Sequence, residues 1–272
     1  MIFYLPLLYT LATRYERHSV RGFIMFLIIY IIPQFLLMFC FASQRDWWMW
    51  ILSIFFVIDL YEIGYIQNDA ETIKKEDNPT LRLFPKELEY YEKHKISIYS
   101  FRIFIAILLS YFFLSYSSFS YYIIGCVIVL WILLPIYCVY NSIRGIWNFP
   151  LLTILTSYRI IMPLAFCLSE PQWGLFLYAY IMYPLPTILQ QMLMGKFGIE
   201  FSFLKRFLIS DYSGRYLFRI KYYVVVLFLL IVVTYIFRLS TLILIIPLYF
   251  CIVRIVLFYY QKVINSCYEN KN

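Results

Sequence analysis

Long apolar stretches separated by short polar connections fill almost the whole of this 272-residue sequence. A bilayer core needs roughly 20 apolar residues per helix, so each stretch predicts a membrane-spanning helix. The predicted helices cover residues 23–43, 47–67, 99–117, 120–141, 149–168, 173–193, 220–237 and 239–260. The apolar residues 1–13 are too few to span and include Pro6, so they predict a short interfacial or re-entrant segment.

The composition supports an all-α fold, a polytopic transmembrane bundle of about eight spanning helices. Hydrophobic residues make up 63% of the chain and charged residues only 14%, whereas a soluble domain carries about a quarter charged residues. The mean hydropathy is +0.76. The helices and their connections use nearly the whole sequence, so we predict a single integral-membrane domain over residues 1–272.

The two long polar connections, residues 68–98 and 194–219, lie on the same side of the membrane as both termini. That side carries nearly all of the 23 lysines and arginines, and the opposite side carries only Arg45 and Arg238. Because lysine and arginine resist translocation, the termini and long loops are predicted to be cytoplasmic, in an inner membrane. Residues 86–95 predict either a helix on the membrane surface or a solvated connector; both interpretations are open. The net charge of +8 then reflects topology and attraction to anionic lipid, not nucleic-acid binding.

The second predicted helix carries acids where an apolar helix should have none. Asp59 and Glu62 lie within its apolar run. Ionisable groups are costly inside a bilayer, so their presence there indicates a structural or functional role. At about 100° per residue, Glu62, Asp69, Thr72 and Glu76 fall within about 80° of one another. The sequence therefore predicts an acidic stripe from the membrane interior to the cytoplasmic mouth.

Two accounts of this stripe are open. The two intramembrane acids can pair structurally with Arg159 of the fifth helix, although this does not explain why the stripe continues through Asn68 and Asp69. Carboxylates at helical spacing also suit Mg²⁺, which is usually held by one or two carboxylates together with substrate phosphates. Lys74 and Arg82 would then contact phosphate oxygens.

The segment YIQNDAETIKKEDNPTLRL resembles the first aspartate-rich motif of the UbiA superfamily of intramembrane prenyltransferases. The matching residues are Asn68, Asp69, Thr72, Glu76 and Arg82. As in that family, the motif begins at the cytoplasmic end of the second helix. The segment YNSIRGIWNFP, which contains Arg144, is similar to the family's Tyr and basic residue before a Pro.

The sequence departs from the family's pattern in three places. Thr72 stands where an Asp is expected, and the predicted bundle has one spanning helix fewer than is usual. The second loop lacks a paired acidic motif and holds only Glu200 and Asp211. Its basic residues are Lys196, Lys205, Arg206, Arg215, Arg219 and Lys221. These basic groups can bind phosphate directly, or they can simply keep the loop on the cytoplasmic side of the membrane. Both interpretations are open.

The resemblance implies a Mg²⁺-dependent transferase that acts on a polyprenyl lipid and a diphosphate-bearing donor. It implies Asp69, Thr72 and Glu76 as metal ligands, and Asn68, Lys74, Arg82, Arg144, Arg159 and Arg215 as substrate-binding residues. Asp59 or Glu62 would orient the acceptor or take its proton.

Two reactions fit the resemblance. The first hypothesis is phosphoribosyl transfer from phosphoribosyl pyrophosphate to polyprenyl phosphate for cell-envelope glycans, because NPTLRL is similar to that branch and the second loop is basic. The alternative is transfer of a polyprenyl group to an aromatic ring. A transporter or a non-catalytic accessory subunit is also open. Pro184 and Pro186 predict a kink in the sixth helix, but no internal repeat of the transporter kind is present.

Overall fold

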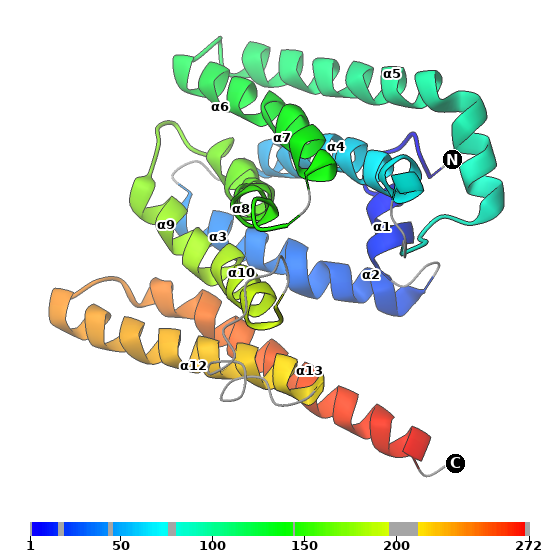
Figure 1. Cartoon of the computed structure of the whole chain (residues 1–272). Coiled ribbons are helices and arrows are strands. Elements are labelled where there is room, and N and C mark those ends of the chain that lie inside the picture. The colour runs from blue at the N-terminus through cyan, green and yellow to red at the C-terminus, as the bar shows by residue number, and fades with distance from the viewer. Residues whose placement is uncertain are drawn as a thin grey trace. The chain divides into compact units, whose positions relative to one another are not determined.

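The computed structural model describes residues 2–15, 19–42, 46–75, 80–143, 145–195 and 212–269. Every regular element in these residues is a helix, which confirms the all-α prediction for this part of the chain. The chain divides into two compact units, Met1–Leu177 and Tyr178–Asn272, and the boundary falls within α9 (Trp173–Met182). Figure 1 labels the helices along the chain.

The described residues of unit 1 form mainly eight helices. They are α1 (Leu8–Arg14), α2 (Val20–Phe26), α3 (Ile32–Phe41), α4 (Trp47–Ala70), α5 (Pro85–Tyr116), α6 (Tyr121–Trp131), α7 (Leu133–Ser142) and α8 (Asn148–Ala165). A π-helical turn, η1 (Leu27–Ile31), joins α2 to α3, and a 3₁₀ turn, η2 (Thr72–Lys75), follows α4. Unit 2 contains the end of α9, α10 (Pro184–Leu193), α12 (Tyr212–Phe237), the 3₁₀ turn η4 (Thr241–Leu244) and α13 (Ile245–Glu269).

Helix α4 is the central element of unit 1. It packs against α1, α5, α7 and α8, and 72% of its apolar window is buried, against 11–33% in the other long apolar helices. The side chain of Asp46 starts it by accepting hydrogen bonds from the N–H groups of Trp48 and Met49. Gly64 lets α7 approach closely, because a Cβ at this position would overlap the ring of Tyr137. The acidic stripe therefore belongs to the most enclosed helix of the unit.

In the described part of the chain, six helical stretches are long and apolar enough to cross a membrane. They correspond to six of the eight predicted spans. The other two also form helices but do not meet the same test. Helix α8 carries polar residues along its 18-residue length, and the stretch 173–193 is divided into the ten-residue helices α9 and α10. The described part of the protein is thus all-helical and contains several apolar helices of membrane-spanning length.

The predicted loop 68–98 is mostly helical. Residues 86–95 are not a separate surface helix, because they form the first turns of α5, which continues without a break to Tyr116. Pro85 opens this helix, and the side chain of Glu87 accepts a hydrogen bond from the N–H of Phe84 at 2.9 Å. Figure 1 shows these first turns running at an angle to the rest of α5.

The predicted kink at Pro184 and Pro186 is confirmed as a break between α9 and α10. Pro186 has no N–H to bond the carbonyl oxygen of Met182. In unit 2 the hydroxyl of Tyr223 donates to this oxygen at 2.8 Å, and the hydroxyl of Tyr222 donates to that of Ile181 at 2.7 Å. Helix α12 thus satisfies carbonyl groups next to the break.

A buried cluster holds the N-terminal segment in unit 1. Phe3 and Tyr9 pack with Ile66 of α4 and with Tyr91 and Ile98 of α5, and all five side chains are at most 1% exposed. This apolar contact places the N-terminal segment beside the acidic side of α4.

Candidate functional site

A fully buried guanidinium group lies in unit 1 beside the acids of α4. Arg102 of α5 has no exposed surface, and neither do Asp59 and Glu62. Its Nη1 donates to Oδ1 of Asp59 at 2.8 Å, and its Nη2 lies 2.7 Å from Oε2 of Glu62. The alternative in which these acids pair with Arg159 is wrong, because α5 and not α8 supplies the cation. A buried charge needs such partners, so the acids also account for an arginine within an apolar helix.

The same group ties the N-terminal segment to α4. Arg102 donates from Nε to the carbonyl oxygen of Phe3 at 2.7 Å and from Nη2 to that of Leu5 at 3.1 Å. The N–H of Thr10 donates to Oε1 of Glu62 at 2.6 Å. The segment predicted to be interfacial or re-entrant is therefore anchored inside unit 1 along the acidic stripe.

A second cluster lies at the C-terminal end of α4, around Asp69. The carboxylate of Asp69 is fully buried and accepts two hydrogen bonds from Arg14, at 2.8 and 3.1 Å. Arg82 and the amide of Asn68 each donate to its Oδ1 at 3.1 Å, and the hydroxyl of Tyr9 donates to its Oδ2 at 3.0 Å. The structure thus brings together three predicted site residues and adds Arg14 and Tyr9.

The protonation states at this cluster follow from its surroundings. Burial raises the pKa of the Tyr9 hydroxyl, and the charge of Asp69 raises it further, so the hydroxyl is a neutral donor. Burial opposes the charged form of Arg14, but its hydrogen bonds to Asp69 and the charge of that carboxylate raise its pKa overall. The guanidinium carbon of Arg14 also lies 4.2 Å from the centroid of the Tyr65 ring. Arg14 is therefore a firmly charged partner of Asp69.

These contacts bear on the predicted magnesium site. Five N–H or O–H contacts reach the two oxygens of Asp69, which offer about four lone-pair positions. Thr72 is buried in η2, and Glu76 lies outside the described residues. Among the residues that the structure describes, no three His, Cys, Asp or Glu side chains form a metal-binding group. The described residues do not fit a magnesium ion while Arg14 and Arg82 hold Asp69.

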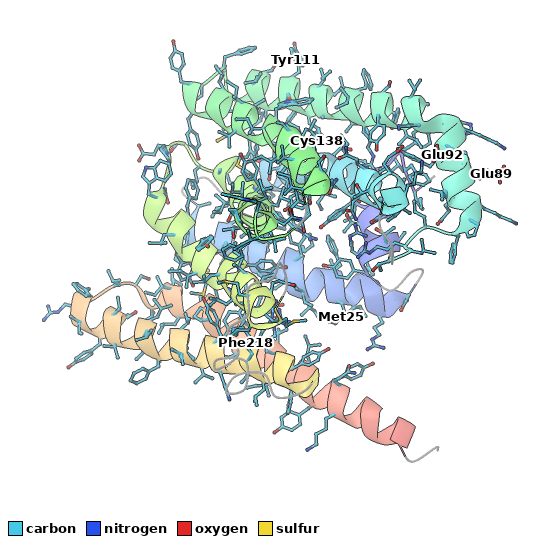
Figure 2. All side chains as sticks on the ribbon, in the orientation of Figure 1. Met25, Glu89, Glu92, Tyr111, Cys138 and Phe218 are labelled. Atoms are coloured by element: carbon cyan, nitrogen blue, oxygen red, sulfur yellow. The ribbon has the colours of Figure 1, made fainter. Side chains whose placement is uncertain are left out.

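Lys74 belongs to a different, more exposed cluster. It pairs with Glu92 of α5 and lies 3.6 Å from Oε2 of Glu71, while Lys95 donates to Oε1 of Glu71 at 2.5 Å. Figure 2 labels Glu92 on the first turns of α5. Exposed pairs of this kind contribute little to stability. The structure therefore joins Lys74 to the start of α5 and not to Asp69.

Arg159 lies half-buried among tyrosine rings. Its guanidinium carbon is 4.5 Å from the ring centroid of Tyr30 and 5.9 Å from that of Tyr61. Its Nη1 donates to the hydroxyl of Tyr65 at 3.5 Å. Arg14 lies over the ring of the same tyrosine. Tyr65 therefore contacts Arg159, which the sequence predicted as a site residue, and Arg14, which it did not.

The remaining predicted site residues are Glu76, Arg144 and Arg215. Glu76 and Arg144 lie outside the described residues, as does the side chain of Arg215. Much of the predicted loop 194–219 is also outside them, and α12 begins at Tyr212, earlier than the predicted start at residue 220.

Unit 1 contains a cavity of about 390 Å³ between α4, α5 and α7. Its lining includes Gln67, Glu71, Lys95, Tyr99 and Tyr137, so one part is polar and another aromatic. It adjoins the same end of α4 as Asp69 but opens on another face of the helix, because residues 67 and 69 lie about 200° apart.

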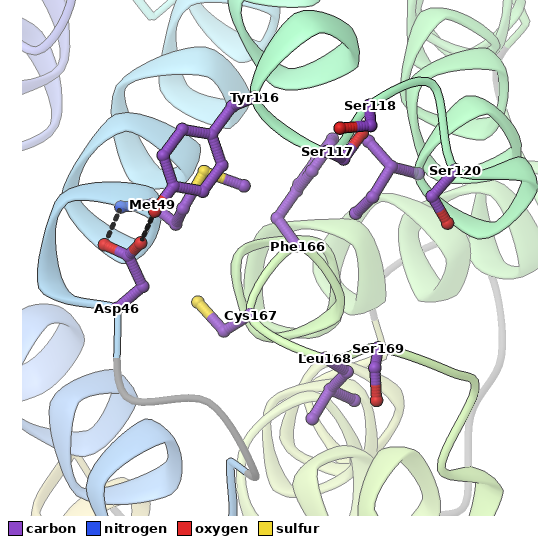
Figure 3. A pocket seen from close by; sticks show the side chains of 11 residues that line it. Asp46, Met49, Tyr116, Ser117, Ser118, Ser120, Phe166, Cys167, Leu168 and Ser169 are labelled. Atoms are coloured by element: carbon purple, nitrogen blue, oxygen red, sulfur yellow. Dashed lines mark hydrogen bonds between the residues drawn. The ribbon is translucent and has the colours of Figure 1, made fainter.

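A further cavity of about 300 Å³ lies at the opposite end of α4 (Figure 3). Asp46, Tyr116 and Cys167 are among its lining residues. Figure 3 shows the carboxylate of Asp46 joined to the hydroxyl of Tyr116 and to the backbone of Met49. At 1.5 Å per residue, Asp46 is about 35 Å from Asp69 along α4, so this cavity is separate from the predicted site.

Sequence reasoning missed the N-terminal partners and Arg102. Arg102 lies in the predicted span 99–117, where a single arginine is as unusual as Asp59 and Glu62 are in their helix. A search of the sequence for intramembrane residues of opposite charge would have paired Arg102 with Asp59 and Glu62. No comparable signal marks Tyr9 and Arg14, because their role depends on the chain folding back beside α4.

Comparisons with protein-family models, with curated proteins and with solved structures find no match for this chain, so the UbiA family stays a resemblance.

Proposed function

We propose that this protein is an integral-membrane transferase of the UbiA type, which acts on a polyprenyl lipid with a diphosphate-bearing donor. The proposal is carried by the arrangement at Asp69, where a buried carboxylate lies between Arg14 and Arg82 at the end of the central helix. Guanidinium groups bind carboxylate and phosphate oxygens with the same bidentate geometry. An incoming phosphate group can therefore bind other N–H groups of these guanidinium groups while Asp69 continues to hold them.

The first candidate reaction is phosphoribosyl transfer. A phosphate oxygen of polyprenyl phosphate forms a bond to the anomeric carbon of phosphoribosyl pyrophosphate, and the bond from that carbon to the diphosphate breaks. The diphosphate leaves with the electron pair. Arg14 and Arg82 would stabilise the negative charge that develops on it, and the neutral hydroxyl of Tyr9 would add a hydrogen bond. Asp69 would hold both guanidinium groups in position.

The choice of donor rests on the sequence. The NPTLRL segment and the basic residues after the sixth predicted helix favour phosphoribosyl transfer, and Arg14 adds a further cation for ligands that carry phosphate. Transfer of a polyprenyl group to an aromatic acceptor is the alternative within the same family. The burial of Asp59 and Glu62 and their pairing with Arg102 favour a structural role for these acids over proton transfer.

The proposal includes a specific membrane arrangement. Eight helices would span an inner membrane, with α8 and the α9–α10 pair crossing in addition to the six long apolar stretches. Both termini and the Asp69 end of α4 would face the cytoplasm, as the distribution of lysine and arginine predicts.

A substrate panel tests the proposal. Purified protein in lipid nanodiscs is incubated with polyprenyl phosphate and phosphoribosyl pyrophosphate, or with polyprenyl diphosphate and an aromatic acid, each with and without Mg²⁺. Lipid-linked phosphoribose in the first reaction supports the preferred assignment, and a prenylated aromatic acid in the second supports the alternative. Absence of both products would rule out both transferase assignments.

One observation favours a second candidate, a non-catalytic accessory subunit. Every oxygen of Asp69 is already engaged by the protein's own donors, as expected of a structural carboxylate. Asp69→Asn separates the two roles. An enzyme should lose turnover in this variant, whereas an accessory subunit should lose only stability and keep its cellular function wherever the variant still folds.

A further inference from the structure

Unit 2 contains two arginines that lie across from each other on neighbouring helices. Helices α12 and α13 form an antiparallel hairpin (Figure 1), and the ring of Tyr223 stacks on that of Phe250 with centroids 4.8 Å apart. One helical turn before Tyr223 stands Arg219, and one turn after Phe250 stands Arg254. Because the helices are antiparallel, both steps lead in the same direction along the hairpin. Arg219 and Arg254 are therefore at the same level, on facing sides of the pair.

These arginines have few partners within the described residues. Arg254 is only 7% exposed, and its buried Nε has no hydrogen-bond partner. Arg219 is half-buried and donates from Nε to Oε1 of Gln190 at 2.6 Å and from Nη2 to Oγ1 of Thr187 at 3.3 Å. Both acceptors are neutral side chains of α10. In this part of the chain no carboxylate forms an ion pair with either guanidinium group.

Such an arrangement is unfavourable without an anion. A buried charge loses its hydration, and two like charges at the same level also repel each other. Arginines in membrane proteins usually avoid this cost by extending their long side chains to water. Arg254 makes little use of that solution here, because only 7% of it is exposed and its Nε is buried. An anionic ligand would supply the countercharge that the described residues do not provide.

We propose that Arg219 and Arg254 bind the phosphate group of an amphiphile. Of the five N–H groups of a guanidinium, Arg219 uses two in these contacts. The remaining N–H groups, with those of Arg254, outnumber the acceptor positions of a single carboxylate. A phosphate group offers more oxygens and accepts bidentate hydrogen bonds from two guanidinium groups. The apolar length of α12 and α13, most of which is not buried within the protein, suits an attached apolar chain.

This site lies within unit 2 and does not depend on the proposed transferase reaction. The experiment uses the full-length protein in detergent micelles with dodecyl phosphate as the probe, and with dodecanol and inorganic phosphate as comparison ligands. Affinity and melting temperature are measured for the wild type and for Arg254→Met. The wild type should bind dodecyl phosphate saturably and melt at a higher temperature, whereas Arg254→Met should bind about tenfold more weakly or worse.

Two further variants guard against a change in folding. Lys221→Met removes an exposed positive charge from the opposite face of α12 and should leave the affinity within about twofold. Arg254→Glu supplies an internal countercharge to Arg219, so it should raise the melting temperature without ligand and abolish the response to dodecyl phosphate.

The comparison ligands identify the source of the phosphate. A response confined to dodecyl phosphate supports the site and assigns a lipid, and an equal response to inorganic phosphate supports the site and assigns a soluble phosphate. An equal response to dodecanol would overturn the proposal, because the chain alone would then account for binding. Equal affinities of the wild type and Arg254→Met for dodecyl phosphate would overturn it as well.

Discussion

Arg102 illustrates how a charged side chain is accommodated inside an apolar helix. Its guanidinium group contacts two carboxylates and two backbone carbonyl oxygens, all in unit 1. These contacts come from α4 and from the N-terminal segment, so one side chain joins three parts of the chain. Removing it would leave Asp59 and Glu62 buried without their cation.

We therefore expect Arg102→Met to be among the most damaging substitutions in unit 1. Breaking a buried ion pair from one side costs about 3–5 kcal/mol, because the remaining charge is uncompensated. The free energy of unfolding in a denaturing-detergent titration measures this loss. The triple variant that also carries Asp59→Asn and Glu62→Gln should recover much of it. A single variant as stable as the wild type would contradict the assigned contacts.

Asp46 should give the protein a specific dependence on pH. The hydrogen bond from the hydroxyl of Tyr116 lowers the pKa of Asp46, and those from the N–H groups of Met49 and Trp48 act in the same direction. Because its folded pKa is below its unfolded value, its stabilisation is present above about pH 4 and is lost as the pH falls further. Asp46→Asn keeps an N-cap but cannot ionise.

The melting temperatures of the wild type and Asp46→Asn, compared across this pH range, provide the test. The wild type should be the more stable at neutral pH, and the difference should shrink in acid. A difference that does not change with pH would show that the charge of Asp46 is unimportant.

At the scale of elements, the break between α9 and α10 requires compensation from another helix. The hydroxyl of Tyr223 is fully buried and donates to the carbonyl oxygen of Met182, which Pro186 leaves without its usual N–H partner. Tyr223→Phe should lower the free energy of unfolding by about 1–3 kcal/mol, because the carbonyl group stays buried and loses its donor. The matched control is Tyr235→Phe on the same helix, where the side chain is 86% exposed.

The control should change the free energy of unfolding by no more than about 0.5 kcal/mol. Equal effects of the two substitutions would mean that the Tyr223 hydroxyl does not support the break.

The pattern of apolar residues predicted the positions of the helices more accurately than it predicted their ends. All eight predicted stretches are helical, because apolar length is a strong signal. Residues 86–95 were predicted as a separate surface helix, since their charges ended the apolar run. Charged residues such as Glu89 and Lys93, four apart and 2.7 Å from each other, are compatible with a continuing helix. The sequence therefore marks the apolar part of α5 but not its first turns.

The candidate site was predictable only in part. The part of the predicted stripe that lies on α4 was recognised, since Glu62 and Asp69 both face the N-terminal segment. Thr72 lies beyond the end of α4 in η2, and Glu76 lies outside the described residues. Helical periodicity within one element is enough for that inference. Partners from other elements, such as Arg14, depend on tertiary packing, which one sequence does not reveal.

At the scale of the whole molecule, the number of spanning helices can be tested with a single position. Glu170 is exposed and lies between α8 and α9. If α8 and the α9–α10 pair both cross the membrane, Glu170→Cys should be labelled from the same side as Ser118→Cys. If neither crosses, it should be labelled from the side of Lys93→Cys. Membrane-impermeant thiol reagents on cells and on inverted vesicles, in a background without native cysteines, distinguish these outcomes.

In the proposed function, Arg14 and Arg82 at Asp69 bind the diphosphate of the phosphoribosyl donor in a membrane protein. The most direct test is the initial rate of lipid-linked phosphoribose formation in nanodiscs by the wild type, Arg82→Met and Lys93→Met. Arg82 is partly exposed, so its replacement should be tolerated by the fold, and Lys93 is an exposed control on α5. We predict that Arg82→Met lowers kcat/KM by about 10²-fold or more, while Lys93→Met stays within about twofold of the wild type. Turnover by Arg82→Met equal to that of the wild type would contradict the role of Arg82, and no turnover by the wild type would contradict the proposed reaction.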